Sequence, residues 1–174
     1  MLLHLTEYYV MFAILYVETI PKIINPTLVC TMHRPSFGYF EYCNVSRNAQ
    51  NDPSASFYIK ILQLPVTSFS VHIEVHYLSN VRQPIVPLNS TWDGCQFLAN
   101  RKRFRSFERV YNLLGYYTNV NHSCPYNHDI IGKDMSIDTQ KVPFPLLPGV
   151  YALKTLYYVD GEKTLSIDAS GKVV

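Results

Sequence analysis

One stretch of this 174-residue chain alternates strictly between apolar and polar side chains. From Ser68 to Leu78, apolar residues occupy every second position and polar residues occupy the positions between them. Because successive side chains of a strand point to opposite faces, this period of two predicts a half-buried strand in an antiparallel sheet. The apolar face consists of Phe69, Val71, Ile73, Val75 and Tyr77, and the polar face of Ser70, His72, Glu74 and His76.

Other runs predict further strands around this one. Residues 37–45 are rich in aromatic side chains, residues 56–64 alternate, and a short strand is expected near residues 135–138. The Leu64-Pro65 break favours a hairpin or a tight corner, so we expect the strands on either side of it to be neighbours.

The C-terminal part of the chain predicts a hairpin. Residues 151–159 and 165–169 both alternate, and Asp160-Gly161 lies between them. Asp-Gly between two alternating runs is typical of a tight type I′ turn, because both turn residues need a positive φ.

The period changes in the middle of the chain. Pro84 and Pro87 restrict the segment before Trp92 to a sheet edge or a loop. Apolar residues then recur at helical spacing, which predicts an amphipathic helix of about four turns that stops at Gly115. Its apolar positions are Phe104, Phe107, Val110 or Tyr111, and Leu114, and its basic positions are Arg101, Lys102, Arg105 and Arg109.

Together these elements predict an all-β, immunoglobulin-like, two-sheet antiparallel sandwich with one inserted amphipathic helix. We expect residues 20–174 to form a single domain behind a signal peptide at residues 1–19. The apolar centre of that leader, residues 8–17, is too short to span a bilayer. Glu7 stands where a basic residue is usual, so a weak membrane anchor or a misassigned start is the alternative.

Cysteines and glycosylation triplets indicate the secretory pathway. A cysteine follows an Asn-x-Ser/Thr triplet closely in residues 89–95 and 121–124. This pairing is typical of chains that fold where disulfides persist and glycans are added, so we predict a secreted, extracellular protein. The triplets begin at Asn44, Asn89 and Asn121, and the cysteines are Cys30, Cys43, Cys95 and Cys124.

Four cysteines allow three pairings, and the sequence does not choose among them. We favour the local pairing, Cys30 with Cys43 and Cys95 with Cys124, because each pair brackets one local unit. Zinc is disfavoured, since the chain has no Cys-x-x-Cys and its histidines lack standard ligand spacing.

Composition and motifs disfavour several classes of function. A net charge of +2 does not indicate a nucleic-acid partner. The chain lacks a Gly-x-Ser-x-Gly elbow, a glycine-rich phosphate loop and a His-Glu-x-x-His motif, so we predict no enzymatic activity and no cofactor. Ser123, His122 and Asp129 are the residue types of a catalytic triad, but the simpler interpretation is a polar loop with a glycosylation hydroxyl.

Two polar groups have a functional and a simpler interpretation. His72, Glu74 and His76 fall on one strand face and are either a pH-sensitive or metal-binding group or, as we favour, a solvated surface. The basic residues of the helix most simply face solvent, and contact with an anionic ligand or a membrane surface is the alternative.

Five motifs carry a resemblance that covers roughly residue 37 to the C-terminus. They are Phe40-Glu41-Tyr42-Cys43, the strands between Ile59 and Val75, residues 89–97 around Trp92-Asp93-Gly94-Cys95, residues 119–126 with Cys124-Pro125-Tyr126, and Leu147-Pro148-Gly149-Val150-Tyr151. On these motifs the chain resembles a large family of small secreted insect proteins of unknown function, to which the chemosensory CheB-type proteins are related. That family looks like a distant branch of the ML lipid-recognition sandwiches. The chain departs from it at Val150, where an acidic or polar residue is usual, and in its proline-rich segment before Trp92.

The resemblance implies a hydrophobic small molecule, such as a lipid or a pheromone-like compound, held between two sheets. An extracellular receptor and peripheral membrane contact are compatible with it. The alternative is an extracellular protein–protein module with a solid core, suggested by Phe144, Leu146 and Leu147 in a proline-rich loop. The pocket residues that the resemblance implies are Phe57, Ile59, Ile61, Phe69, Val71, Ile73, Val75, Phe104, Phe107, Tyr111, Tyr151, Leu153 and Tyr157.

Overall fold

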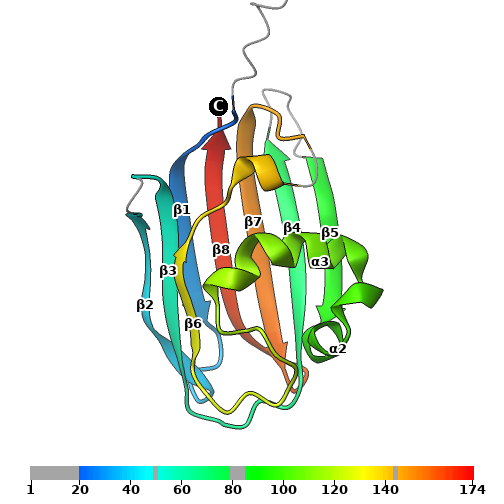
Figure 1. Cartoon of the computed structure of the whole chain (residues 1–174). Helices are drawn as coiled ribbons and strands as arrows, with labels where there is room; N and C mark the ends of the chain where they lie inside the picture. Colours follow the sequence, from blue (N-terminus) through cyan, green and yellow to red (C-terminus); the bar gives the residue numbers. More distant parts are fainter. Residues whose placement is uncertain (1–19, 49–50, 79–84, 143–144) are drawn as a thin grey trace, which may run out of the picture.

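Two antiparallel sheets pack face to face in the computed structural model, with helices beside the smaller sheet (Figure 1). The structure describes residues 20–48, 51–78, 85–142 and 145–174, so the predicted signal peptide lies outside the described residues. Strands predominate throughout the described part, and the predicted two-sheet antiparallel β-sandwich is confirmed at this level.

The larger sheet has five strands in the order β1-β8-β7-β4-β5. Every neighbouring pair in it is antiparallel. The edge position of β5 agrees with its proline content. Its strands are β1 (Ile23–Met32), β8 (Glu162–Val173), β7 (Gly149–Val159), β4 (Phe69–Leu78) and β5 (Ile85–Asp93).

The smaller sheet consists of β2 (Gly38–Arg47), β3 (Pro53–Ile61) and β6 (Ile130–Met135), with β3 in the centre. A disulfide between Cys30 of β1 and Cys43 of β2 joins the two sheets. The second disulfide joins Cys95 to Cys124, so the favoured local pairing is confirmed.

The helical segment is broken rather than continuous. It comprises α2 (Gly94–Ala99), the 3-10 turn η1 (Arg101–Arg103), α3 (Arg105–Leu114) and the 3-10 turn η2 (Gly115–Tyr117). The expectation of one continuous four-turn helix is therefore wrong, but the predicted stop at Gly115 is confirmed, because α3 ends at Leu114 and Gly115 is its C-cap. Helical spacing did not reveal a first helix that begins directly after β5, nor the break that separates it from α3.

The predicted hairpin is confirmed. Asp160 and Gly161 connect β7 to β8 with φ values of 53° and 80°, which is the left-handed conformation that a type I′ turn requires. Glycine adopts this conformation without strain at the second position.

Three strand expectations need correction. Strand β1 has no counterpart in the prediction, because Asn25 at φ 49° and Pro26 shift its register and hide its alternation. Strands β3 and β4 lie in different sheets: around Leu64-Pro65 the chain crosses between layers, and Val66 pairs with Tyr126 on the way. The short strand β6 overlaps the predicted range of 135–138 only at Met135 and otherwise lies before it.

Candidate functional site

The lower end of the sandwich is tightly closed. We define this end by the Asp160-Gly161 turn, which lies at the bottom of Figure 1. Apolar side chains from the large sheet, from α2 and from the loops meet here, and each exposes 6% or less of its surface. These are Phe37, Val66, Phe97, Tyr126, Val159 and Leu165.

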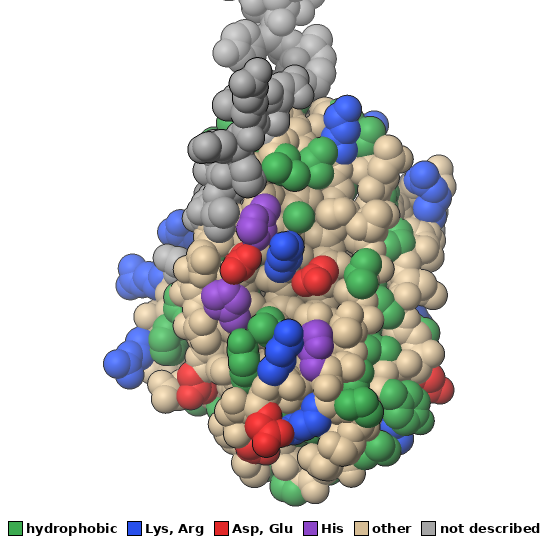
Figure 2. All heavy atoms as spheres, turned by 180° about the vertical axis from the view of Figure 1, so that it is seen from behind, with side chains coloured by type: hydrophobic (Ala, Val, Ile, Leu, Met, Phe, Trp, Pro, Cys, Tyr) green, Lys and Arg blue, Asp and Glu red, His purple; other side chains and the backbone are tan. Residues whose placement is uncertain are grey.

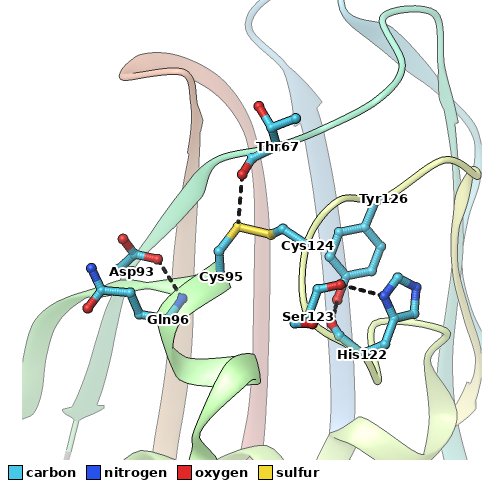
Figure 3. The surroundings of a disulfide bond; sticks show 8 residues. All are labelled: Thr67, Asp93, Cys95, Gln96, His122, Ser123, Cys124 and Tyr126. Carbon is cyan, nitrogen blue, oxygen red and sulfur yellow. Dashed lines mark hydrogen bonds between the residues drawn. A yellow bond between two sulfur atoms is a disulfide. The ribbon is translucent and has the colours of Figure 1, made fainter.

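The Cys95–Cys124 disulfide lies at this end and joins α2 to the loop that carries Tyr126 (Figure 3). The Asp93 carboxylate accepts a hydrogen bond from the Gln96 amide at 2.8 Å and so caps α2, the helix that carries Cys95. The Cys95 sulfur lies 3.5 Å from the Thr67 carbonyl oxygen; because a disulfide sulfur carries no proton, this is a contact and not a hydrogen bond. The Cys95–Cys124 disulfide therefore attaches α2 to the loop after η2.

Tyr126 anchors the other side of the disulfide. Its hydroxyl donates to the His122 carbonyl, and the His122 ring stacks on it with centroids 4.4 Å apart. Desolvation by burial raises the pKa of Tyr126 to about 12. The side chain is therefore a neutral core residue at physiological pH.

Asp129 ties the same loop to β3. Its carboxylate accepts hydrogen bonds from the Ile61 amide at 3.0 Å, the Lys60 ammonium at 2.9 Å and the Tyr58 hydroxyl at 2.7 Å. The Ile61 amide bond, followed by those of Lys60 and Tyr58, lowers the pKa of Asp129 to about 2. The Asp129 side chain is thus fully engaged in holding the loop.

An aromatic cluster fixes α3 against β5. The Trp92 and Phe107 rings stack with centroids 4.8 Å apart and planes 7° apart, and Phe97 meets Phe107 edge-on at 4.5 Å. Phe104 and Tyr111 complete the cluster at 6.1 Å and 5.3 Å from Phe97. The Trp92 indole nitrogen is buried here and has no hydrogen-bond partner among the described residues.

Toward the upper end, the inner face of the large sheet is less completely covered. We define this end by the end of β4 and the start of β7. Ile73 and Thr155 pair across these strands and are 6% and 8% exposed. The next inner pair, Val75 with Leu153, is only half-buried, and so is the pair Tyr77 with Tyr151 beyond it.

Tyr157 borders the same interior. Its neighbours across the sheet, Val71 and Leu165, are buried. Burial raises the pKa of the Tyr157 phenol, so this group lies deep among protein atoms. The side chain nevertheless keeps accessible surface.

The inner surface closes again farther along β8. Val173 is 3% exposed, near the point where the Thr139 hydroxyl donates to the Pro21 carbonyl at 2.6 Å. The half-buried strip on β4 and β7 therefore lies between two covered regions.

The predicted pocket residues occupy this interior. Six are buried in the main apolar cluster: Phe57, Ile59, Ile61, Val71, Ile73 and Phe107. Five are partly buried and pack against it: Phe69, Phe104, Tyr111, Leu153 and Tyr157. Val75 and Tyr151 are half-buried outside the cluster, and the Tyr151 ring lies 4.8 Å from that of Tyr77.

A groove of about 560 Å³ lies between α3, η2 and the segment that holds η3 (Thr139–Lys141). Helix α3 crosses in front of β7 and β4, and η3 lies above it (Figure 1). The groove was not predicted from the sequence, although the spacing of 109, 112 and 116 places these residues on one helical face. Its lining consists of Arg109, Asn112, Leu113, Tyr116, Tyr117, Ser136, Asp138 and Lys141.

The outer face of the large sheet is polar, and Figure 2 shows histidine, acidic and basic side chains interspersed on it. Glu74 accepts from His72 at 3.1 Å and from His76 at 2.8 Å, and these bonds, that of His76 first, lower the pKa of Glu74. The three residues are neighbours, as predicted. No group of three or more His, Cys, Asp or Glu side chains within the described residues is arranged to hold a metal ion.

The triad residue types do not form a triad. The His122 ring contacts the Ser123 carbonyl oxygen at 2.6 Å, and the Asp129 carboxylate is held by β3 instead of by a histidine. In the proline-rich loop, Leu147 is exposed but Leu146 is half-buried, and Phe144 lies outside the described residues.

Surface positions fit an extracellular chain. Asn44, Asn89 and Asn121 all have exposed side chains, as glycosylation requires. Two disulfides in a small β protein are consistent with an extracellular location. None of the described helices is long and apolar enough to cross a membrane.

Comparison with known proteins finds a match between part of the chain and one family model. The model of a family described as a protein of unknown function (DUF1091) matches residues 68–153. The match begins just before β4 and ends within β7, so it includes α3, the groove and the Cys95–Cys124 disulfide. No curated protein matches the chain.

Proposed function

We propose that this protein is a secreted, non-enzymatic binding protein that holds a hydrophobic small molecule, such as a lipid or a pheromone-like compound, between its two layers. The observation that carries the proposal is the strip of half-buried apolar side chains on the inner face, above all Val75 and Leu153. The family match to residues 68–153 covers this strip.

The resemblance to insect CheB-related proteins and to the ML lipid-recognition sandwiches supports the same ligand class and suggests a role in chemosensation. Sandwiches of the ML type bind lipid between sheets that splay apart. A partly covered inner face beside a firmly closed lower end is the arrangement that such binding requires.

The energetics permit useful affinity. Burial of each CH₂ contributes about 0.8 kcal/mol, so an acyl chain of roughly sixteen carbons gains about 13 kcal/mol. Association costs of about 4 kcal/mol or more leave enough for micromolar binding, which corresponds to about 8 kcal/mol.

The direct test is binding by the purified glycoprotein. Organic extraction followed by mass spectrometry is expected to recover a co-purified lipid, and unlabelled fatty ligands are expected to displace a fluorescent fatty probe. Absence of both would overturn the proposal.

A pair of variants locates the site. Leu153→Trp places a large side chain on the inner face, whereas Leu156→Trp makes the same change on the same strand but on the outer face, opposite His72. We expect Leu153→Trp to weaken probe binding at least about tenfold with little loss of stability, and Leu156→Trp to bind as the parent does.

The same pair tests the alternative of a solid core. If the interior is filled, Leu153→Trp overpacks it and lowers the free energy of unfolding by about 1–3 kcal/mol. That loss, together with absence of lipid binding, would favour a protein–protein module.

A further inference from the structure

The groove between α3 and η3 differs in chemistry from the apolar interior. Arg109, Asn112 and Ser136 supply hydrogen-bond donors, while Leu113 and the rings of Tyr116 and Tyr117 supply apolar surface. Its volume of about 560 Å³ is within the range of small-molecule sites, roughly 300–1,000 Å³.

The groove carries one uncompensated positive charge among its described residues. Lys141 forms an ion pair with Asp138 at 3.1 Å, which also lowers the pKa of Asp138. Arg109 has no ion-pair or hydrogen-bond partner among the described residues. A guanidinium forms paired hydrogen bonds with a carboxylate, so the groove complements a single negative charge.

The groove lies between two segments that both cover the inner face of the large sheet, because α3 crosses in front of β7 and β4 and η3 lies above it (Figure 1). One face of the helix carries Phe107 and Tyr111, which pack in the aromatic cluster. The opposite face carries Arg109 and Asn112, which line the groove. The helix is therefore a wall common to the polar groove and the apolar core.

We infer that this groove binds the carboxylate of an amphiphile, with Arg109 as the residue that selects the charged head. The inference rests on the proposed function, because the apolar part of the ligand requires the interior. It assigns the ligand to the class of long-chain carboxylic acids in preference to neutral hydrocarbons, alcohols or esters.

The test compares dodecanoic acid with 1-dodecanol at pH 7.4, below the micelle concentration of the acid, by displacement of a neutral fluorescent probe. Both ligands have the same chain length and differ in the charge of the head. The parent protein is expected to bind the acid at least about tenfold more tightly than the alcohol.

Arg109→Gln is expected to abolish this preference by weakening acid binding alone, and Arg109→Lys is expected to restore part of it. Arg105→Gln removes an exposed arginine one turn earlier, outside the groove lining, and is expected to keep the preference. Circular dichroism and thermal unfolding check that each variant folds.

The outcomes separate the two proposals. Alcohol binding without an acid preference, or an acid preference that survives Arg109→Gln, would overturn the role of the groove and leave the hydrophobic site standing. Failure of the parent protein to bind either ligand, with no lipid extracted from it, would overturn both.

Discussion

The lower and upper ends of the sandwich share β4 and β7 but differ in what covers them. At the lower end, α2 and the loop that carries Tyr126 close over the inner faces, and the Cys95–Cys124 bond holds them together. At the upper end, Val75 and Leu153 keep accessible surface. The comparison shows that strand pattern and packing density are separate properties, because the alternation continues unchanged through both ends.

The largest difference between the ends is expected from truncation of core side chains. Phe97 is 2% exposed and contacts three aromatic rings, so Phe97→Ala should lower the free energy of unfolding by about 3–5 kcal/mol. Leu153→Ala should cost about 1–2 kcal/mol, because that side chain is already incompletely packed. Urea unfolding measures both, and equal costs would remove the distinction between the ends.

The disulfide at the lower end should contribute nearly as much. Cys95 and Cys124 are 29 residues apart, so their double replacement by serine is expected to cost roughly 3–4 kcal/mol. Cys30 and Cys43 are 13 residues apart, and their double replacement should cost about 3 kcal/mol.

Hydrogen exchange adds a local readout for the same variants. Loss of the Cys95–Cys124 bond should speed exchange mainly at the lower end, including the amide of Tyr126, which is paired with Val66. Uniformly faster exchange in both halves would show that the Cys95–Cys124 disulfide stabilises the whole sandwich and not the lower end in particular.

Asp129 should make the attachment of the loop to β3 dependent on pH. Its pKa of about 2 lies below the ordinary value of 3.8, so its stabilising effect is fully present above about pH 4 and is lost as the pH falls toward 2. Asp129→Asn should lower the thermal midpoint at pH 7, and the difference from the parent should shrink between pH 4 and pH 2. A constant difference across that range would contradict this role.

The smallest effect is expected at Trp92. Its indole N–H is buried without an acceptor among the described residues, so Trp92→Phe removes an unsatisfied donor while keeping a ring against Phe107. We expect stability to change by less than about 1 kcal/mol in urea unfolding, whereas Trp92→Ala should cost about 3–5 kcal/mol. A large loss in the phenylalanine variant would point to an acceptor for the indole, such as a buried water.

Local signals predicted the elements whose causes are local. The alternation around Ile73, the Asp160-Gly161 turn and the disulfide partners depend on neighbouring residues, and all three agree with the structure. Strand β1 was not predicted, because Asn25 and Pro26 interrupt its alternation of apolar and polar residues. The prediction that β3 and β4 are neighbours was wrong, because a corner at a proline such as Pro65 can lead either to a hairpin or to the opposite sheet.

The candidate site shows the same division. Sequence reasoning, aided by the family resemblance, named eleven residues that join or flank the main apolar cluster, with Val75 and Tyr151 outside it. It missed the groove at Arg109 and Asn112, because the opposite wall comes from Ser136, Asp138 and Lys141 on a segment distant in sequence.

The sequence by itself determined the alternating strand β4, the β7–β8 hairpin and the local pairing of the cysteines, since each follows from residue types at short spacing. Only the tertiary structure decided which part of the inner face stays half-buried and where an unpaired arginine lies beside a groove. These features depend on which distant segments cover a given face, and a period of two or 3.6 residues carries no information about that covering.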